Sequence, residues 1–196
     1  AVGLFFGILC AQFRGKWPDY LLMVVAVLGI ALPSMVLGPI LRMIFGVKLG
    51  ILPVTGWGKT NQIILPALVL GLGTVAGNTR NMRASMLAIT TQDYVKTARA
   101  KGLSPIRVVL KHQFKNSLVP IIPNLGVQIA GVLMGSFVVE SMFLIPGLGR
   151  YFVDSVTNLD YPLIMGLTVF YGAFLVTMNL IVDVLYGLID PRIRVK

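Results

Sequence analysis

Charged residues are scarce in this sequence, and acidic residues are the scarcest of them. Only 12% of the 196 residues are charged, and 7 acidic residues stand against 17 lysines and arginines, for a net charge of +10. Soluble chains carry about 25% charged residues, so this chain has too few charges to cover a water-facing surface. The shortage argues against a water-soluble enzyme and against a disordered tail. Nucleic-acid binding is disfavoured as well, because it needs a basic face on a soluble module.

Cysteine and histidine each occur once. Cys10 lies in an apolar run, so no internal disulfide can form and packing is its expected role. His112 follows Lys111, where a surface or docking role is more typical than a proton relay or a metal ligand. No cluster of acids and histidines falls within an apolar window. We therefore expect no metal, no cofactor and no catalytic residue in this chain.

Long uncharged runs fill most of the sequence. Hydrophobic residues make up 56% of it, and the mean hydropathy is +0.85. Four windows of at least 20 residues carry no charge, and such a length crosses about 30 Å of hydrocarbon at about 1.5 Å per residue of helix. The sequence therefore predicts an all-α, polytopic membrane bundle, with one transmembrane domain over 1–196. The predicted spans cover about 1–13, 20–42, 60–80, 117–139 and 161–184.

The first of these spans is short. The chain starts at Ala1 without an initiator Met, and its apolar run of 13 residues ends at Arg14. A spanning helix needs about 20 residues, and the charged leading region and cleavage site of a signal peptide are missing. We expect a helix cut by truncation, so that the chain is a fragment of a longer protein.

The basic residues fall mainly on one side of the predicted spans. Loops 14–19, 80–117 and 188–196 carry 13 of them, whereas loops 43–59 and 140–160 carry three and Arg42 lies at a membrane edge. Positive charge collects on the cytoplasmic side of inner-membrane proteins. The asymmetry predicts that loop 80–117 and the C-terminus are cytoplasmic.

Loop 80–117 is too long for a simple connector between neighbouring helices, which takes about 2–8 residues. Helix-forming residues run from Arg83 to Lys101, and Gly102 is typical of a helix stop. Ser104 and Pro105 then predict a new helix, with Ile106, Val109, Leu110 and Phe114 near one face. Eight basic residues and one acid give the loop a charge of +7. Such a segment either lies on anionic lipid or docks on a soluble partner.

Three separated motifs in this order resemble one family. The first motif is in the loop, which reads KTARAKG followed by LSPIRVVLKHQFKNSLVPII. The second comprises VVESMFLIPGLGRYFVDSV and, shortly after it, DYPLIMGLTVF. The third is NLIVDVLYGLIDPRIR, near the end of the chain. This sequence resembles the inner-membrane permease subunits of bacterial ABC importers, in the dipeptide, oligopeptide and nickel uptake branch. It is most similar to the first permease subunit of oligopeptide systems, over nearly the whole chain.

The resemblance implies the fold of type I importer permeases and a location in the bacterial cytoplasmic membrane. It implies four kinds of partner: a second permease subunit, two nucleotide-binding ATPase subunits, an extracytoplasmic substrate-binding protein and membrane lipid. It also implies that segment 93–105 is the coupling element that meets an ATPase subunit, with apolar anchors at Tyr94, Val95 and Ala98. The residues expected at this contact are Asp93, Tyr94, Val95, Lys96, Thr97, Ala98, Arg99, Ala100, Lys101, Gly102, Leu103, Ser104 and Pro105.

The family's usual loop motif is Glu-Ala-Ala, followed by three residues of any type and then Gly. The loop of this chain departs from that motif. The matching positions read Lys96, Thr97 and Ala98, with Gly102 kept. An ATP site is not expected in the chain, because Gly56–Thr60 ends in Gly-Lys-Thr but lacks the earlier glycine of a phosphate-binding loop. ATP and Mg²⁺ are therefore expected on the partner subunits.

A second candidate element lies on the predicted outer side, at Glu140, Pro146, Gly147 and Gly149. Two interpretations stand side by side: a tight loop with glycines at positive φ, or an outer gate or contact for the binding protein. For the whole chain, a secondary transporter driven by an ion gradient is the alternative, although charge-free windows count against it. Peptides are the expected cargo, with nickel or glutathione-like solutes as alternatives.

Overall fold

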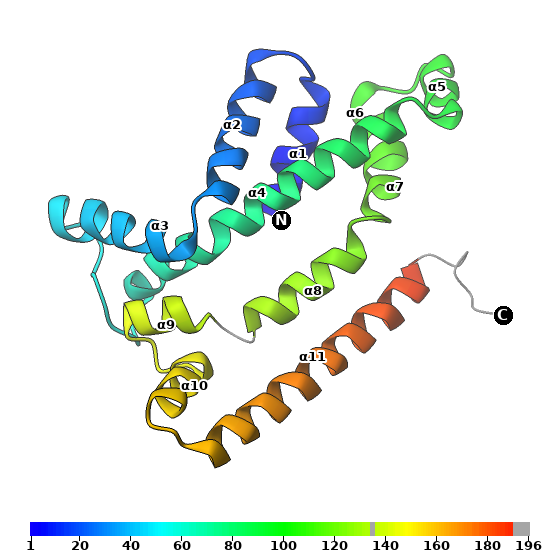
Figure 1. Cartoon of the computed structure of the whole chain (residues 1–196). Coiled ribbons are helices and arrows are strands. Elements are labelled where there is room, and N and C mark those ends of the chain that lie inside the picture. The colour runs from blue at the N-terminus through cyan, green and yellow to red at the C-terminus, as the bar shows by residue number, and fades with distance from the viewer. Residues whose placement is uncertain (134–135, 190–196) are drawn as a thin grey trace. The chain divides into compact units, whose positions relative to one another are not determined.

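The computed structural model describes residues 1–133 and 136–189, and within them every regular element is helical. This confirms the prediction of an all-helical chain (Figure 1). The apolar residues recur at helical spacing and do not alternate with polar residues, so the sequence favours helices over strands. The elements in chain order are α1 (Val2–Gln12), α2 (Trp17–Ala31), α3 (Ser34–Leu41), the π-helical η1 (Arg42–Lys48), α4 (Thr60–Thr90), α5 (Asp93–Ala100), α6 (Pro105–Arg107), the π-helical η2 (Val108–Phe114), α7 (Lys115–Leu118), α8 (Ile122–Leu133), α9 (Phe137–Phe143), α10 (Leu148–Thr157) and α11 (Tyr161–Ile189).

Two helices are long and apolar enough to cross a membrane, α4 and the part of α11 over Tyr161–Val182. They contain the predicted spans 60–80 and 161–184, apart from the last two residues of the second. α4 continues ten residues beyond its predicted end, because charge marks the membrane edge and does not stop a helix. Whether each helix spans a bilayer stays a prediction.

The other two predicted full-length spans are not single helices. The segment 20–42 is interrupted at Leu32 and Pro33, where α2 ends and α3 begins, and the two together form either a broken span or a re-entrant loop. The segment 117–139 is divided among α7, α8 and α9. Proline lacks a backbone N–H and disfavours helix at the preceding residue, which accounts for the first break.

The chain forms two compact units. Unit 1 comprises Ala1–Ala31, Gly73–Leu125 and Tyr186–Lys196, and unit 2 comprises Leu32–Leu72 and Gly126–Leu185. The core of unit 1 joins buried Met82 and Met86 of α4 to Ile121, and α1 packs against it with Leu4 and Ile8. The core of unit 2 is built on four buried apolar residues of α4 and α9, which are Leu65, Val69, Val139 and Phe143.

In unit 1, glycines allow a close approach of α1 to α4. A Cβ atom at Gly3 would lie 2.8 Å from Cβ of Asn78, and one at Gly7 would lie 2.8 Å from the carbonyl oxygen of Thr79. Two glycines four residues apart are a recurring contact between membrane helices. This contact positions the α1–α2 hairpin on the part of α4 that leads to segment 93–105.

Candidate coupling site

The segment predicted to couple lies in unit 1, at the end of α4 (Figure 1). A single helix from Arg83 to Lys101 was expected, but the structure has two: α4 ends at Thr90 and α5 starts at Asp93. The backbone is extended at Gln92, and the Thr90 hydroxyl donates a 2.7 Å hydrogen bond to the Met86 carbonyl. Threonine side chains that bond to nearby carbonyls tend to bend or end helices. The break lets α5 turn away from α4.

α5 ends in a Schellman turn at Gly102. The Gly102 N–H donates to the Arg99 carbonyl at 2.9 Å, and the Leu103 N–H donates to the Ala98 carbonyl at 3.4 Å. Gly102 has φ +72°, which is the left-handed conformation that this turn requires. A Cβ atom there would meet nothing within 4 Å. Glycine is therefore needed for its backbone conformation and not to make room beside a neighbouring group.

The buried face of α5 differs from the predicted one. Val95 and Ala98 are buried in a small core with Val108, so they hold the hairpin together and are not available as anchors for a partner. Among the three expected anchors, only Tyr94 is exposed, at 43%. Leu103 packs against the small core. The remaining expected contact residues are exposed: Asp93, Lys96, Thr97, Arg99, Ala100, Lys101, Gly102, Ser104 and Pro105.

The predicted restart of the helix is present. Ser104 precedes α6, and Pro105 occupies its first turn, where a missing N–H costs no hydrogen bond. The helix continues without interruption through η2 and α7 to Leu118. α5 and this second helix are therefore two arms joined at Gly102.

Polar side chains connect the second arm to the rest of unit 1. Gln113 is 1% exposed; its amide nitrogen donates to the Thr90 hydroxyl at 3.0 Å, and its amide oxygen accepts from Gln12 at 3.3 Å. The Ser85 hydroxyl donates to the Ser117 carbonyl at 2.8 Å. These bonds tie η2 and α7 to α1 and α4, so that the segment is anchored at several points.

A small cavity lies where the ends of α1, α4 and α5 meet. Its volume is about 230 Å³, and it is lined by Ala11, Gln12, Arg14, Leu87, Thr90, Thr91, Arg99 and Gln113. Its two arginines lie near helix C-termini, where the partial negative charge of the carbonyls favours cations.

A buried ion pair joins α2 to α4 in the same unit. Arg83 donates to the two carboxylate oxygens of Asp19 at 2.7 and 2.8 Å, and the Gly15 N–H donates to the same carboxylate at 3.0 Å. The Asp19 side chain is 2% exposed. The sequence placed both residues near a membrane edge but offered no signal that they would pair.

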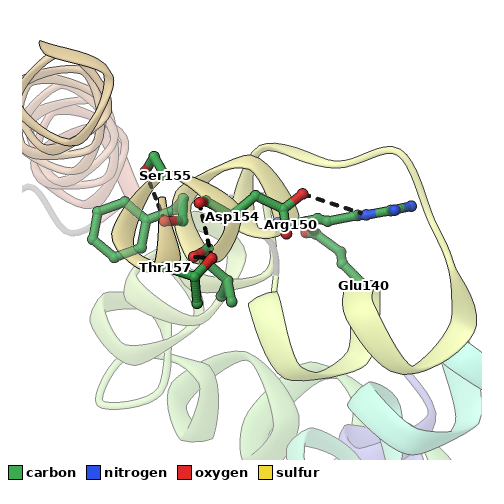
Figure 2. A network of polar contacts seen from close by, with 7 residues as sticks. Glu140, Arg150, Asp154, Ser155 and Thr157 are labelled. Carbon is green, nitrogen blue, oxygen red and sulfur yellow. Dashed lines mark hydrogen bonds and ion pairs between the residues drawn. The ribbon is translucent and has the colours of Figure 1, made fainter. Parts of the chain in front are cut away.

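The predicted outer element lies in unit 2 and is built around Glu140 of α9. Glu140 is 8% exposed, and its carboxylate accepts a 3.0 Å hydrogen bond from the backbone N–H of Arg150, in the first turn of α10 (Figure 2). The first N–H groups of a helix lack partners inside the helix and attract negative charge. Glu140 therefore caps α10 in place of Gly147, which has no side chain to do so.

The glycines beside Glu140 are needed for space. Gly147 has φ −114° and Gly149 lies within α10, so the interpretation with glycines at positive φ is wrong for both. A Cβ atom at Gly149 would lie 2.9 Å from the Glu140 carboxylate and 2.9 Å from Cα of Phe137. Pro146 is exposed. Of the four predicted residues, three form one closely packed arrangement and Pro146 lies at its surface.

The surface of α10 carries weaker interactions. Arg150 and Asp154 approach to 3.7 Å across one helical turn, and both are about half exposed. The Ser155 and Thr157 hydroxyls donate to backbone carbonyls of α10 itself (Figure 2). Exposed ion pairs of this kind contribute little stability, so Glu140 is the polar residue that fixes this element.

Two further predictions are placed as follows. Within the residues that the structure describes, no three side chains drawn from histidine, cysteine, aspartate and glutamate lie close enough together to hold a metal ion. The predicted cytoplasmic C-terminal loop 188–196 includes Arg192, Arg194 and Lys196, which lie outside the described residues, as do 190 and 191.

Comparison with known proteins gives matches along almost the whole chain. The family described as "Binding-protein-dependent transport system inner membrane component" matches residues 3–195. The dipeptide transport system permease protein DppB of Bacillus subtilis (strain 168) is 45% identical over 192 residues, which is 98% of this chain and 62% of the relative. The glutathione transport system permease protein GsiC of Escherichia coli (strain K12) is 44% identical over 194 residues, 99% of this chain and 63% of the relative.

The same identity and coverage hold for GsiC of Shigella dysenteriae serotype 1 (strain Sd197). The chain thus spans slightly less than two thirds of the length of these relatives.

Proposed function

Because the chain belongs to the family of binding-protein-dependent transport system inner membrane components, we propose that it is a permease subunit of an ATP-driven ABC importer. Its cargo is a peptide, which it helps to move across the bacterial cytoplasmic membrane. The observation that carries this proposal is the match over residues 3–195, together with relatives whose names specify dipeptide and glutathione transport. Glutathione is itself a short peptide, so both names favour the same cargo class over nickel.

The chain is a transport subunit without its own ATP site in this proposal. Two nucleotide-binding subunits hold ATP and Mg²⁺, a second permease completes the pathway, and an extracytoplasmic binding protein delivers the cargo. Motion of the ATPase subunits must reach the membrane helices. The segment 93–105 is suited to receive it on the cytoplasmic side, because its hairpin has a buried core of its own and several bonds to α1 and α4.

The outer element contacts the binding protein or gates the pathway in this proposal. The buried Glu140 acts by positioning α10, whereas the exposed Pro146 is available for contact. Support for this assignment comes from the charge asymmetry of the sequence, which predicts that the element lies on the side opposite to the basic loop.

Reconstitution tests the function directly. The permease pair and ATPase subunits are placed in proteoliposomes, and uptake of a labelled dipeptide or tripeptide is measured with the binding protein present. We expect uptake that requires ATP and the ATPase subunits and that persists when ionophores abolish all gradients. Uptake driven by an ion gradient without ATPase subunits would instead identify a secondary transporter.

Gly102→Trp tests the coupling segment. The side chain would be forced into the left-handed region, which costs a non-glycine residue about 1–2 kcal/mol, and it would alter the exposed turn between the two arms. We expect peptide uptake to be lost while membrane insertion and expression stay normal. Gly58→Trp is the matched control, because Gly58 also has positive φ with nothing within 4 Å but lies before α4. Undiminished uptake by Gly102→Trp would contradict the assignment.

A further inference from the structure

The cavity where the ends of α1, α4 and α5 meet carries positive charge. All of its lining residues belong to unit 1. Arg14, which follows α1, and Arg99, in the last turn of α5, both line it. No acidic side chain of the described residues contributes to the lining. Its volume of about 230 Å³ is several times the volume of about 30 Å³ that a water molecule takes up in the liquid, so a small ion or headgroup has room there.

The acids of unit 1 do not neutralise these two arginines. Asp19 forms the buried ion pair with Arg83, and Asp93 pairs with a lysine of its own helix at 2.9 Å. These are the two acids of unit 1 within the described residues, where neither Arg14 nor Arg99 forms an ion pair. Helix C-termini carry about half a negative charge each, so those beside the cavity offset only part of two full charges. The cavity therefore keeps an excess of positive charge.

Two amides add unused hydrogen-bond donors to the lining. Gln113 is 1% exposed; its amide nitrogen donates one hydrogen to the Thr90 hydroxyl at 3.0 Å, and its amide oxygen accepts one from Gln12 at 3.3 Å. A glutamine amide has two N–H groups, so each of these glutamines retains a second one. Together with the two guanidinium groups, they give the cavity an excess of donors, which favours an anion as its ligand.

The number and shape of the donors favour a phosphate group. A guanidinium presents a planar fork that matches two oxygens of a carboxylate or a phosphate. A carboxylate has two oxygens to offer, whereas a phosphate monoester has three strong acceptor oxygens and a charge of about −1.5 to −2 at pH 7. Two guanidinium groups and two amides are therefore better satisfied by a phosphate than by a carboxylate.

We propose that this cavity binds a phosphate group, held by Arg14 and Arg99 and by the unused N–H of Gln113. The group belongs either to a free phosphate or phosphate ester, or to the headgroup of a phospholipid. This inference goes beyond the proposed function and does not depend on it. Arg14 lies between α1 and α2, and Arg99 lies in α5. A bound phosphate thus bridges two segments through charges that repel each other without it.

The first experiment measures binding to the complete complex in neutral detergent after lipid is removed. The probe is radiolabelled inorganic phosphate in equilibrium dialysis, and any ATPase sites contribute equally to wild type and variants. We expect Arg14→Gln and Arg99→Gln each to weaken the phosphate binding of this cavity by about tenfold, as for the loss of a charged hydrogen-bonding group. Lys16→Gln and Arg107→Gln are matched controls, because both residues are exposed and neither lines the cavity; they should bind as wild type does.

Hydrogen exchange of the α5 amides, followed by mass spectrometry, gives a readout specific to this chain. Opening of α5 would release the phosphate, so at ten times its Kd the exchange should slow by roughly tenfold. Chloride at equal ionic strength should leave the exchange unchanged. We expect the protection by phosphate in wild type and in Lys16→Gln, and no protection in the variant with both Arg14→Gln and Arg99→Gln.

A second experiment identifies the source of the phosphate. The complex is moved from nanodiscs of phosphatidylglycerol or of phosphatidylcholine into detergent, and retained lipids are counted by native mass spectrometry. A phospholipid that wild type keeps and the arginine variants lose, and that blocks free phosphate, identifies a headgroup and supports the proposal. Binding of free phosphate with no retained lipid identifies a soluble ligand and supports it as well.

Two results would overturn the inference. One is that neither phosphate nor lipid distinguishes wild type from the arginine variants. The other is that acetate displaces phosphate at an equal or lower concentration, because the site would then be one for carboxylates. Peptide uptake in proteoliposomes is measured separately, so either result would leave the proposed function standing.

Discussion

At the scale of single residues, the ion pair of Asp19 and Arg83 is the most consequential interaction. Asp19 is almost completely buried, and its carboxylate is satisfied by two guanidinium bonds and one backbone N–H. Removing one member of such a pair leaves a buried charge without a partner, at a cost of about 3–5 kcal/mol. The pair thus fixes how α2 is seated on α4.

Arg83→Leu is therefore expected to destabilise the protein by about 3–5 kcal/mol. The measurement is the unfolding midpoint in detergent, followed by circular dichroism, with the yield of monodisperse protein as a second readout. Arg80→Leu is the matched control, because Arg80 lies in the same helix, is exposed and forms no ion pair in the described part of the chain. Equal effects of the two substitutions would show that the pair contributes no stability. Asp19→Asn together with Arg83→Leu should recover part of the loss, because no charge is left buried.

The second prediction at this scale concerns Glu140. Replacing a capping carboxylate by alanine costs about 1 kcal/mol, within a range of about 0.5–2, so Glu140→Ala should lower the unfolding midpoint, whereas Glu140→Gln keeps an acceptor oxygen and should lose less. Asp154→Ala, on the same element but half exposed, is the control and should be near neutral. Protease sensitivity at α10 provides a local readout. A loss as large in Asp154→Ala would mean that α10 depends on general charge and not on the cap.

At the scale of elements, the contact between α1 and α4 depends on the absence of side chains. Gly7 lies against the Thr79 carbonyl and the Arg83 N–H of α4, with Cβ distances of 2.8 and 3.0 Å. A larger residue there must push the two helices apart. Cys10, one turn later in α1, is fully buried, so its thiol reports whether α1 is docked.

Gly7→Leu is expected to expose Cys10. In the wild-type protein the thiol should react with a maleimide only after denaturation, and in the variant it should react in the folded state within minutes. Gly131→Leu serves as the control, since a Cβ atom at Gly131 meets nothing within 4 Å, and it should leave Cys10 unreactive. A Cys10 that stays protected in Gly7→Leu would mean that α1 and α4 tolerate a wider separation than the structure has.

Particular elements show which parts of the candidate site could be predicted from the sequence and which could not. The turn at Gly102 and the restart at Ser104 and Pro105 were predictable, because both depend on the local backbone preferences of those residues. The inward face of α5 was not predictable, because it is set by Val108, a residue of the other arm. The exposure of Ile106 and Leu110 was not predictable either. Both were expected to share a face with Val109 and Phe114, which instead pack against the core of Met82 and Met86.

At the scale of the whole molecule, composition determined the class of protein. The all-helical fold of type I importer permeases, expected from the resemblance, agrees with the family to which the chain belongs. Charge-free windows located α4 and most of α11 because those helices are continuous and apolar. They could not locate the breaks at Pro33 or between α7 and α8, because a window without charge records the depth of a segment in the membrane and not its hydrogen bonding.

Orientation is the prediction that belongs to this scale. The excess of basic residues in loop 80–117 should hold this loop in the cytoplasm and the outer element on the opposite side. With Cys10 replaced by alanine, a cysteine at Lys101 should react with a membrane-impermeant maleimide in inverted vesicles but not in intact cells whose outer membrane is permeabilised. A cysteine at Leu159 should show the reverse pattern. Labelling of both from the same side would refute the topology.

The uninterrupted length of α4 has a mechanical consequence. The helix has 31 residues, about 46 Å at about 1.5 Å per residue, and about two thirds of it lies within the charge-free window. A rigid rod that pivots at the bilayer midplane then has a cytoplasmic arm of about 30 Å and an outer arm of about 15 Å. A displacement of about 3 Å at Thr90 would move Thr60 by about 1.5 Å in the opposite direction. If the proposed function and orientation hold, α4 would act as a lever of roughly two to one, which would exchange the stroke of the ATPase subunits for greater force at the outer end.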